Sequence, residues 1–217
     1  MSWLLLPEII LAYLIGSIPS AVWVGKLFYG IDVRKHGSGN AGATNVIRIL
    51  GYKAGIPVLL FDIFKGWFAV QLAILFPHAL LSAEWIIYIR IILAVAAVTG
   101  HIFPIYAGFK GGKGVAVLAG VGIALYPLAL VIALGIFIFS LVISRYVSLS
   151  SIIAAVVFPF IVIFMLGETN LGMIILAILV GIFIPVSHRK NIRRLLNGQE
   201  SKFLFGRKKS NDQTLVK

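Results

Sequence analysis

The sequence predicts an all-α membrane protein that crosses the bilayer several times. Of its 217 residues, 60% are hydrophobic and only 12% are charged, about half the charged share of a typical soluble domain. The mean hydropathy is +1.05, and apolar runs of roughly 20 residues recur along the chain, each long enough to cross a bilayer as a helix. Lysine and arginine gather in some connecting segments and are missing from others, which predicts an orientation as well as a fold class.

Six segments are apolar enough to cross the membrane, and they cover residues 3–24, 54–76, 85–103, 115–143, 149–166 and 171–186. The first has no basic start and no clear cleavage site, so we expect a retained span rather than a signal peptide. The fourth would measure roughly 45 Å as one helix, against a hydrocarbon core of roughly 30 Å. Tyr126 and Pro127 lie near its middle, and proline interrupts helical hydrogen bonding.

The charges of the loops indicate that this fourth segment is two short spans, which gives seven transmembrane helices in all. With seven spans, every loop that contains lysine or arginine falls on one side, while the loops at residues 77–84, 126–127 and 167–170 contain neither. Because basic loops stay on the cytoplasmic side, we expect the N-terminus outside and the C-terminus in the cytoplasm. Residues 1–200 are expected to form a single transmembrane domain, and residues 201–217 a basic, poorly ordered tail.

The first inner loop, residues 37–48, combines glycines, hydrogen-bonding side chains and an arginine. Three glycines within six residues free the backbone to expose N–H groups, which can cradle an anion. The segment after Gly42 can begin a helix, whose N-terminus adds partial positive charge. Arg48 offers a planar fork for phosphate oxygens. A plain glycine-rich turn is the alternative interpretation of this segment.

The second inner loop reads KGGKG at residues 110–114, just before an apolar segment. It has the ingredients of a phosphate loop, but it is not a Walker A motif, because Ala107 replaces the first glycine and Gly114 replaces the final Ser/Thr. We therefore infer no ATP binding. His101 lies upstream, where a histidine is an interface residue, a structural hydrogen-bond donor or a base.

The remaining inner segments are rich in hydroxyl and basic side chains. Residues 144–151 read SRYVSLSS, and their serines are either helix caps or substrate contacts. Residues 187–198 place apolar side chains at helical spacing and end at a glycine, which predicts a short helix lying in the membrane interface. His188 and Asn191 share one face of that helix. Arg189 and Arg193 share another, where contact with anionic lipid is the simpler interpretation.

Composition and missing motifs argue against several classes of function. The chain has 19 Lys+Arg against 7 Asp+Glu, a net charge of +12, but its aromatic residues lie in apolar runs, so we expect membrane lipid rather than nucleic acid as partner. The sequence has no cysteine, no HExxH or GxSxG motif and no residues at metal-ligand spacing, so no metal or other cofactor is expected. Asp62 and Lys65 lie inside the second span, three residues apart, and can form a structural ion pair.

Four motifs, taken in order, resemble those of one family. They are GSGNAGATNVIR (residues 37–48), HIFPIYAGFKGGKGVA (101–116), RYVSLSS (145–151) and HRKNIRRLLNG (188–198). They are similar to the motifs of the bacterial membrane acyltransferases that use acyl phosphate to acylate glycerol 3-phosphate, the PlsY family. The resemblance implies seven spans in the bacterial plasma (inner) membrane, a cytoplasmic active site, and a reaction that yields lysophosphatidic acid and inorganic phosphate. The implied partners are glycerol 3-phosphate, long-chain acyl phosphate and membrane lipid, with no cofactor and no required protein partner.

The resemblance, carried over motif by motif, implies two sets of functional residues. Those with catalytic roles are Ser38, Arg48, Lys113, His188 and Asn191. Those that bind substrate are Gly37, Gly39, Asn40, Thr44, Asn45, His101, Gly111, Gly112, Ser148, Ser150 and Ser151.

The missing acid–base dyad suggests that the substrate itself takes part in proton transfer. An acyl phosphate has a good leaving group, and its oxygens could accept the proton of the attacking hydroxyl; His101 and His188 are the rival bases.

Two other classes of function remain open at this point. A transporter of phosphorylated solutes usually has internal repeats, which this sequence lacks, and a scaffold for anionic lipid would not need the glycine loops.

Overall fold

The computed structural model describes residues 2–75 and 82–203, and all regular elements in these ranges are helical. The α-helices are α1 (Ser2–Gly16), α2 (Ser20–Tyr29), α3 (Ala43–Leu50), α4 (Tyr52–Leu75), α5 (Ala83–Ile102), α6 (Val115–Leu125), α7 (Pro127–Ser144), α8 (Val147–Phe160), α9 (Leu171–Ser187) and α10 (Arg189–Leu196). Three single turns are η1 (Val33–Lys35), η2 (Ile105–Ala107) and the π-helical η3 (Ile161–Met165). Most of the predicted outer loop 77–84, and the predicted tail from residue 204 onward, lie outside the described residues.

The helices include enough long apolar segments for an integral membrane protein. In the described ranges, α4, α5, α7 and the α8–η3 unit are each long and apolar enough to cross, and the bent pairs α1–α2 and α9–α10 bring the number to as many as six. The expected break at Tyr126–Pro127 is present, since α6 ends at Leu125 and α7 begins at Pro127. However, α6 has only 11 residues, about 17 Å of helix, which is shorter than an ordinary span and would cross only where the bilayer is locally thinned.

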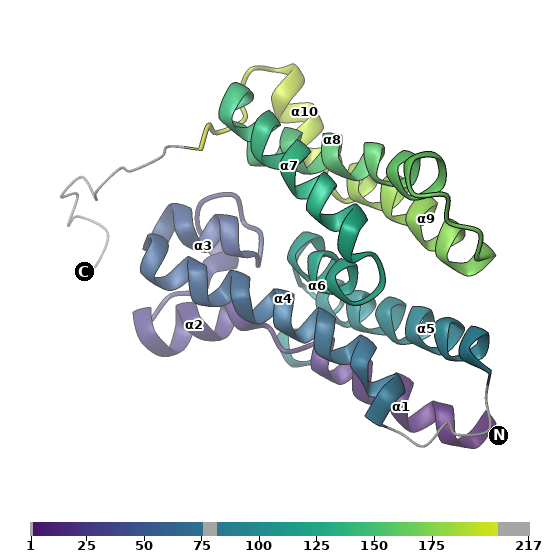
Figure 1. Ribbon diagram of the computed structural model, residues 1–217. Coiled ribbons are helices and arrows are strands. Elements are labelled where there is room, and N and C mark those ends of the chain that lie inside the picture. Colours follow the sequence, from purple (N-terminus) through teal and green to yellow (C-terminus); the bar gives the residue numbers. More distant parts are fainter. Residues whose placement is uncertain (1, 76–81, 204–217) are drawn as a thin grey trace.

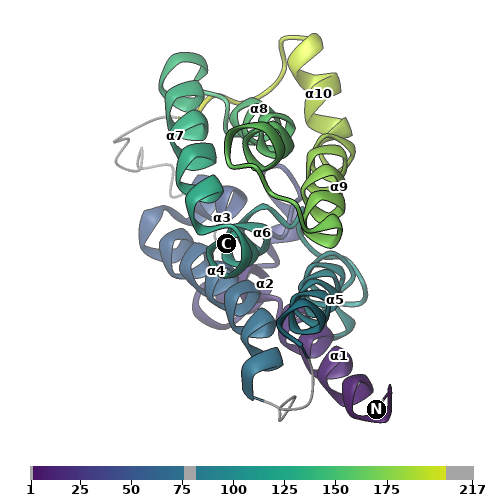
Figure 2. The ribbon, with the colours of Figure 1, turned by 45° about the vertical axis from the view of Figure 1, so that its right-hand side comes forward.

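The helices form two groups that meet at the short helix α6. Figures 1 and 2 show α1, α2, α4 and α5 on one side and α7, α8, α9 and α10 on the other. In the first group α1 and α5 have the most extensive contact, and in the second α8 packs most extensively on α7 and α9; α6 packs most extensively on α4. Between the groups lies the cavity described below.

Small residues bring α4 and α6 into backbone contact. A side-chain Cβ on Gly120 would lie 2.0 Å from the carbonyl oxygen of Ile63, and one on Gly66 would lie 2.2 Å from the carbonyl oxygen of Val117. Because lipid tails are as apolar as the helices, helices in a membrane associate through such close packing. These glycines therefore fix the position of α6, and with it the loop that precedes α6.

The predicted ion pair lies at the break between α1 and α2. Lys65 Nζ is 2.8 Å from Asp62 Oδ1, and both side chains are 1% exposed. Lys65 also donates to the carbonyl oxygen of Ile18 at 2.8 Å, and the Ser20 hydroxyl donates to Asp62 at 2.7 Å. The ammonium thus meets the end of α1 and the carboxylate meets the start of α2, which is the favourable direction for both helix dipoles.

Candidate active site

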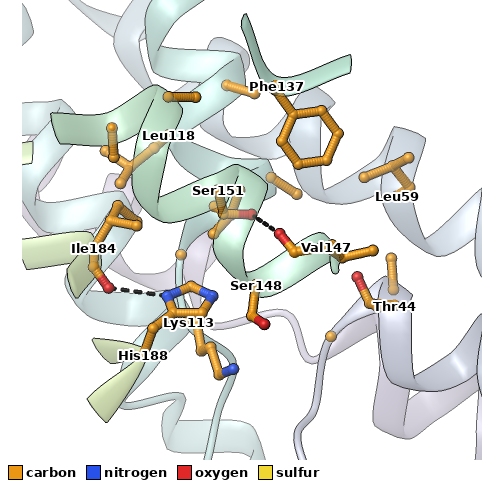
Figure 3. Close-up of a pocket in the computed structure, with 18 of the residues that line it drawn as sticks. Thr44, Leu59, Lys113, Leu118, Phe137, Val147, Ser148, Ser151, Ile184 and His188 are labelled. Carbon is orange, nitrogen blue, oxygen red and sulfur yellow. Dashed lines mark hydrogen bonds between the residues drawn. The ribbon is translucent and has the colours of Figure 1, made fainter. Parts of the chain in front are cut away.

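A cavity of about 460 Å³ opens between the two helix groups. Its walls are largely apolar side chains from α4, α6, α7, α8 and α9, and its polar residues come from the four inner segments singled out in the sequence. In Figure 3, Lys113, Ser148 and His188 lie toward one end of the cavity, while Leu118 and Phe137 lie toward the other. The site is therefore a polar cluster at the mouth of an apolar chamber.

The structure brings most of the predicted site residues together at this cavity. Those that line it are Ser38, Asn40, Thr44, Asn45, Arg48, His101, Lys113, Ser148, Ser151, His188 and Asn191. Gly39 and Gly112 line a neighbouring cavity, and Gly37, Gly111 and Ser150 line neither. Segments far apart in the sequence, from the first inner loop to α10, thus meet at one place.

The first loop is held in shape by Asn45. The Asn45 side chain is 1% exposed, accepts from the backbone N–H of Ser38 at 2.8 Å and donates to three carbonyls of the preceding loop at 2.9–3.1 Å. A Cβ on Gly37 would lie 2.5 Å from Asn45 Oδ1, and Gly37 has a φ of +60°, a left-handed conformation that favours glycine. Asn45 and Gly37 therefore act first as supports that place Ser38 at the cavity.

The second loop is pressed against the end of α5. The backbone N–H of Gly112 donates to the carbonyl oxygen of His101 at 3.2 Å. A Cβ on Gly111 would lie 1.9 Å from that same oxygen, and one on Gly112 would lie 2.3 Å from His101 Nε2. Glycine is needed here because the loop backbone runs so close to the histidine. The loop places Lys113 at the cavity, where its ammonium donates a hydrogen bond to Asn191 Oδ1.

The serines of the third segment differ in what they contact. Ser150 and Ser151 donate to carbonyls four residues earlier in the chain, each at 2.9 Å, so neither hydroxyl caps a helix N-terminus. Ser148 instead donates to Glu200 Oε1 at 2.8 Å. Of the three, only Ser148 is linked by its side chain to the polar cluster.

His188 closes the polar cluster at the junction of α9 and α10. Its Nδ1 lies 2.9 Å from the carbonyl oxygen of Ile184, and a carbonyl can only accept, so Nδ1 carries a proton. In the neutral ring this leaves Nε2 as the acceptor. The imidazole can therefore accept a proton or a hydrogen bond at Nε2 while its orientation is fixed by α9.

Glu200 belongs to the site, and the sequence analysis missed it. It accepts from Asn191 Nδ2 at 2.7 Å, from Arg194 Nε at 2.8 Å and from Ser148, and its side chain is 6% exposed. Burial alone would raise its pKa, but the hydrogen bonds from Asn191, Arg194 and Ser148 outweigh burial and lower the pKa below the usual value. Glu200 is a single acidic residue two positions after Gly198 and belongs to no catalytic motif. Its place directly after the last motif was the only feature of the sequence that pointed to it.

A second cavity, about 420 Å³ in volume, lies next to the first and is more polar. The side chains that line both cavities are Ser38, Asn40, Lys113 and Asn191. Arg189, Lys190 and Arg194 add further positive charge to the second cavity. Two anionic molecules could therefore meet at the shared residues, one with an apolar portion in the first cavity and one entirely in the second.

No group of three histidine or acidic residues in the described part of the chain is arranged to hold a metal ion. The side chains that line the two cavities offer hydroxyls, amides, imidazoles, cations and the carboxylates of Asp62 and Glu200. Cations and amides of this kind bind phosphate by charge-assisted hydrogen bonds.

Comparison with known proteins gives a consistent result. The family model described as glycerol-3-phosphate acyltransferase matches residues 6–198. Glycerol-3-phosphate acyltransferases from Chlorobaculum tepidum and Enterococcus faecalis are 42% and 45% identical, covering 92% and 91% of this chain and 97% and 91% of their own. The crystal structure of PlsY (YgiH), an integral membrane glycerol 3-phosphate acyltransferase, in its glycerol 3-phosphate form has a TM-score of 0.82 and 38% identity, over 92% of this chain and 96% of that one. The lysophosphatidic acid form of the same protein has a TM-score of 0.79 and 37% identity, over 92% of this chain and 95% of that one. The chain belongs to the PlsY-type glycerol-3-phosphate acyltransferase family.

Proposed function

We propose that this glycerol-3-phosphate acyltransferase uses acyl phosphate as its donor and works at the cytoplasmic face of the bacterial plasma membrane. The observation that carries the proposal is the pair of cavities, one apolar and one polar, that share Ser38, Asn40, Lys113 and Asn191. The apolar cavity suits the hydrocarbon chain of a lipid donor, and the polar one suits glycerol 3-phosphate. A hydroxyl of glycerol 3-phosphate attacks the acyl carbonyl, lysophosphatidic acid forms, and inorganic phosphate leaves.

The shared residues would act on the phosphate of the donor. Lys113 neutralises charge that builds up as the carbon–oxygen bond to phosphate breaks, and Ser38 and Asn191 orient the oxygens. Arg48, which also lines the first cavity, adds a second cation at its mouth. Holding both substrates in one place lowers the entropic part of the barrier.

The proton of the attacking hydroxyl has two possible acceptors. An oxygen of the donor phosphate is one, and it leaves with the phosphate. His188 Nε2 is the other, because the Nδ1 contact with Ile184 leaves it free to accept. We propose the phosphate as acceptor, with His188 Nε2 accepting a hydrogen bond from the second hydroxyl of glycerol 3-phosphate, the one that does not attack, and so orienting the molecule. Burial, and then the charge of Lys113, lower the pKa of His188 to about 4, so the profile must be followed down to that pH. A His188→Gln variant that keeps slow turnover and the acidic part of the wild-type profile supports the phosphate as acceptor; loss of an acidic limb near pH 4 would assign the base to His188.

Purified protein supplied with palmitoyl phosphate and glycerol 3-phosphate is expected to form lysophosphatidic acid and inorganic phosphate in equal amounts. Mass spectrometry follows the lipid and a colorimetric assay follows the phosphate. Palmitoyl-CoA serves as the comparison donor and is expected to give no product. Product from palmitoyl-CoA but not from palmitoyl phosphate would overturn the choice of donor.

We also propose the seven-span topology with the four polar segments in the cytoplasm, which the distribution of basic residues supports. The chain has no cysteine, so single cysteines can report sidedness. Leu128→Cys, at the start of α7 where Leu128 is 59% exposed, is expected to react with a membrane-impermeant thiol reagent on intact spheroplasts. Lys35→Cys, at an exposed position at the end of η1 just before the first inner loop, is expected to react only after permeabilisation. An unreactive Leu128→Cys in both conditions would mean that α6 and α7 do not return to the outer surface.

A further inference from the structure

The apolar cavity has a defined depth, which can be followed along two of its helices. From Lys113 at the mouth, α6 runs for 11 residues before Tyr126, about 17 Å of helix. From Ser148, α8 runs for ten residues to Phe158, about 15 Å. Both aromatic side chains line the cavity, so the two helices place them at a similar distance from the polar cluster.

The two aromatic rings form a firm floor. Tyr126 is 6% exposed and Phe158 is 7% exposed, and their rings meet edge to face with centroids 5.3 Å apart at 80°. The Tyr126 hydroxyl donates to the carbonyl oxygen of Met173 at 2.7 Å. Edge-to-face packing and a buried hydrogen bond both resist displacement of the rings. Both rings also belong to a buried cluster with side chains of α7 and α9, so other buried side chains pack against them.

We propose that the Tyr126–Phe158 pair determines the longest acyl chain that the enzyme uses efficiently. The inference rests on the proposed donor, whose chain would occupy the apolar cavity with its phosphate at Lys113. Each methylene that moves from water into a buried position contributes about fourfold in affinity. A chain that reaches the floor gains nothing from further methylenes unless it displaces a ring or bends back. Activity should therefore rise with chain length up to this limit and then stop rising or fall.

Two substitutions are expected to move the limit in opposite directions. Phe158→Ala removes a ring from the floor and deepens the cavity. Ala155→Leu adds bulk one helical turn nearer the mouth, because Ala155 is three residues before Phe158, is 7% exposed and lines the same cavity. The first should favour longer chains and the second shorter ones.

Phe160→Ala is the matched control. Phe160 lies two residues after Phe158 on α8, but it is 57% exposed and does not line the cavity. The same chemical change at this position should leave the chain-length profile as in the wild type. Thermal melting in detergent shows whether each variant is folded, and Phe158→Leu is a milder replacement should Phe158→Ala fail to fold.

The experiment measures kcat/KM for lauroyl, myristoyl, palmitoyl, stearoyl and arachidoyl phosphates in one detergent, always as a ratio to the wild type. This ratio cancels differences in how the donors partition into micelles. Phe158→Ala is expected to raise the arachidoyl-to-palmitoyl ratio by at least about tenfold, equivalent to two newly buried methylenes, and Ala155→Leu to raise the myristoyl-to-stearoyl ratio. Unchanged profiles in folded variants at both positions would overturn the floor assignment. Absence of product from every acyl phosphate with the wild-type enzyme would instead overturn the proposed donor.

Discussion

Replacement of Lys113 by alanine is expected to lower kcat/KM by roughly 100- to 1,000-fold, the usual cost of removing one donor that stabilises developing charge. Lys113 is the cation common to both cavities, and Asn191 fixes its ammonium. Lys110→Ala is the matched control, because Lys110 is an exposed lysine of the same glycine loop that lines neither cavity. Its effect should stay within a few-fold. Similar rates for both variants, with both folded, would remove Lys113 from the phosphate site.

The charge of Lys113 also predicts a pH dependence. Burial lowers its pKa to about 8; Glu200 opposes this shift, and Arg194 and Arg48 add to it. His188 also faces the ammonium. Because the charged form is the active one, kcat/KM should be level only well below the pKa, fall to half near pH 8 and continue to fall as the pH rises further.

Lys113→Arg tests this assignment, because a guanidinium keeps its charge over the whole range from about pH 7 to about pH 10. The variant should be slower, since arginine does not reproduce the lysine geometry, but the alkaline limb should disappear. Persistence of the limb in Lys113→Arg would assign it to another group.

The helices could be predicted because bilayer thickness and hydropathy limit the possibilities. Pro127 interrupts the long fourth segment at the expected residue, and all six apolar segments contain helices in the structure. The shortness of α6 was harder to foresee. It depends on where the glycine loop ends, and Gly114, with a φ of +83°, begins the helix only at Val115.

The sequence could predict which segments meet at the site, but not which of their side chains contact substrate and which support the protein. An arrangement of seven spans puts the four polar segments on the same side of the membrane, and in the structure they meet at one cavity. Sequence does not show which polar atoms are already used within the protein. Asn45 supports a loop and Ser150 bonds to its own helix, whereas Glu200, which no motif marked, joins Ser148 to Asn191. These assignments depend on side-chain contacts between distant segments.

The buried ion pair should have the largest effect on stability. Lys65→Met leaves Asp62 charged and without its cation in a 1% exposed position, and breaking such a pair typically costs about 3–5 kcal/mol. We expect a large fall in melting temperature in detergent. Lys26→Met is the matched control: Lys26 lies 3.9 Å from Asp32 with its side chain 55% exposed, and exposed pairs of this kind contribute about 0–1 kcal/mol.

The double variant Asp62→Asn/Lys65→Met distinguishes a structural pair from a functional one. It removes both charges together, so most of the lost stability should return, as it does when buried pairs are replaced by neutral side chains. The amide oxygen introduced by Asp62→Asn would still accept the hydrogen bond that Ser20 now donates to Asp62. If the pair only joins α1, α2 and α4, turnover should return together with stability. Asp62 also lines the cavity and lies 3.9 Å from His101. A stable double variant without activity would therefore mean that the charge of the pair is needed for turnover as well as for stability.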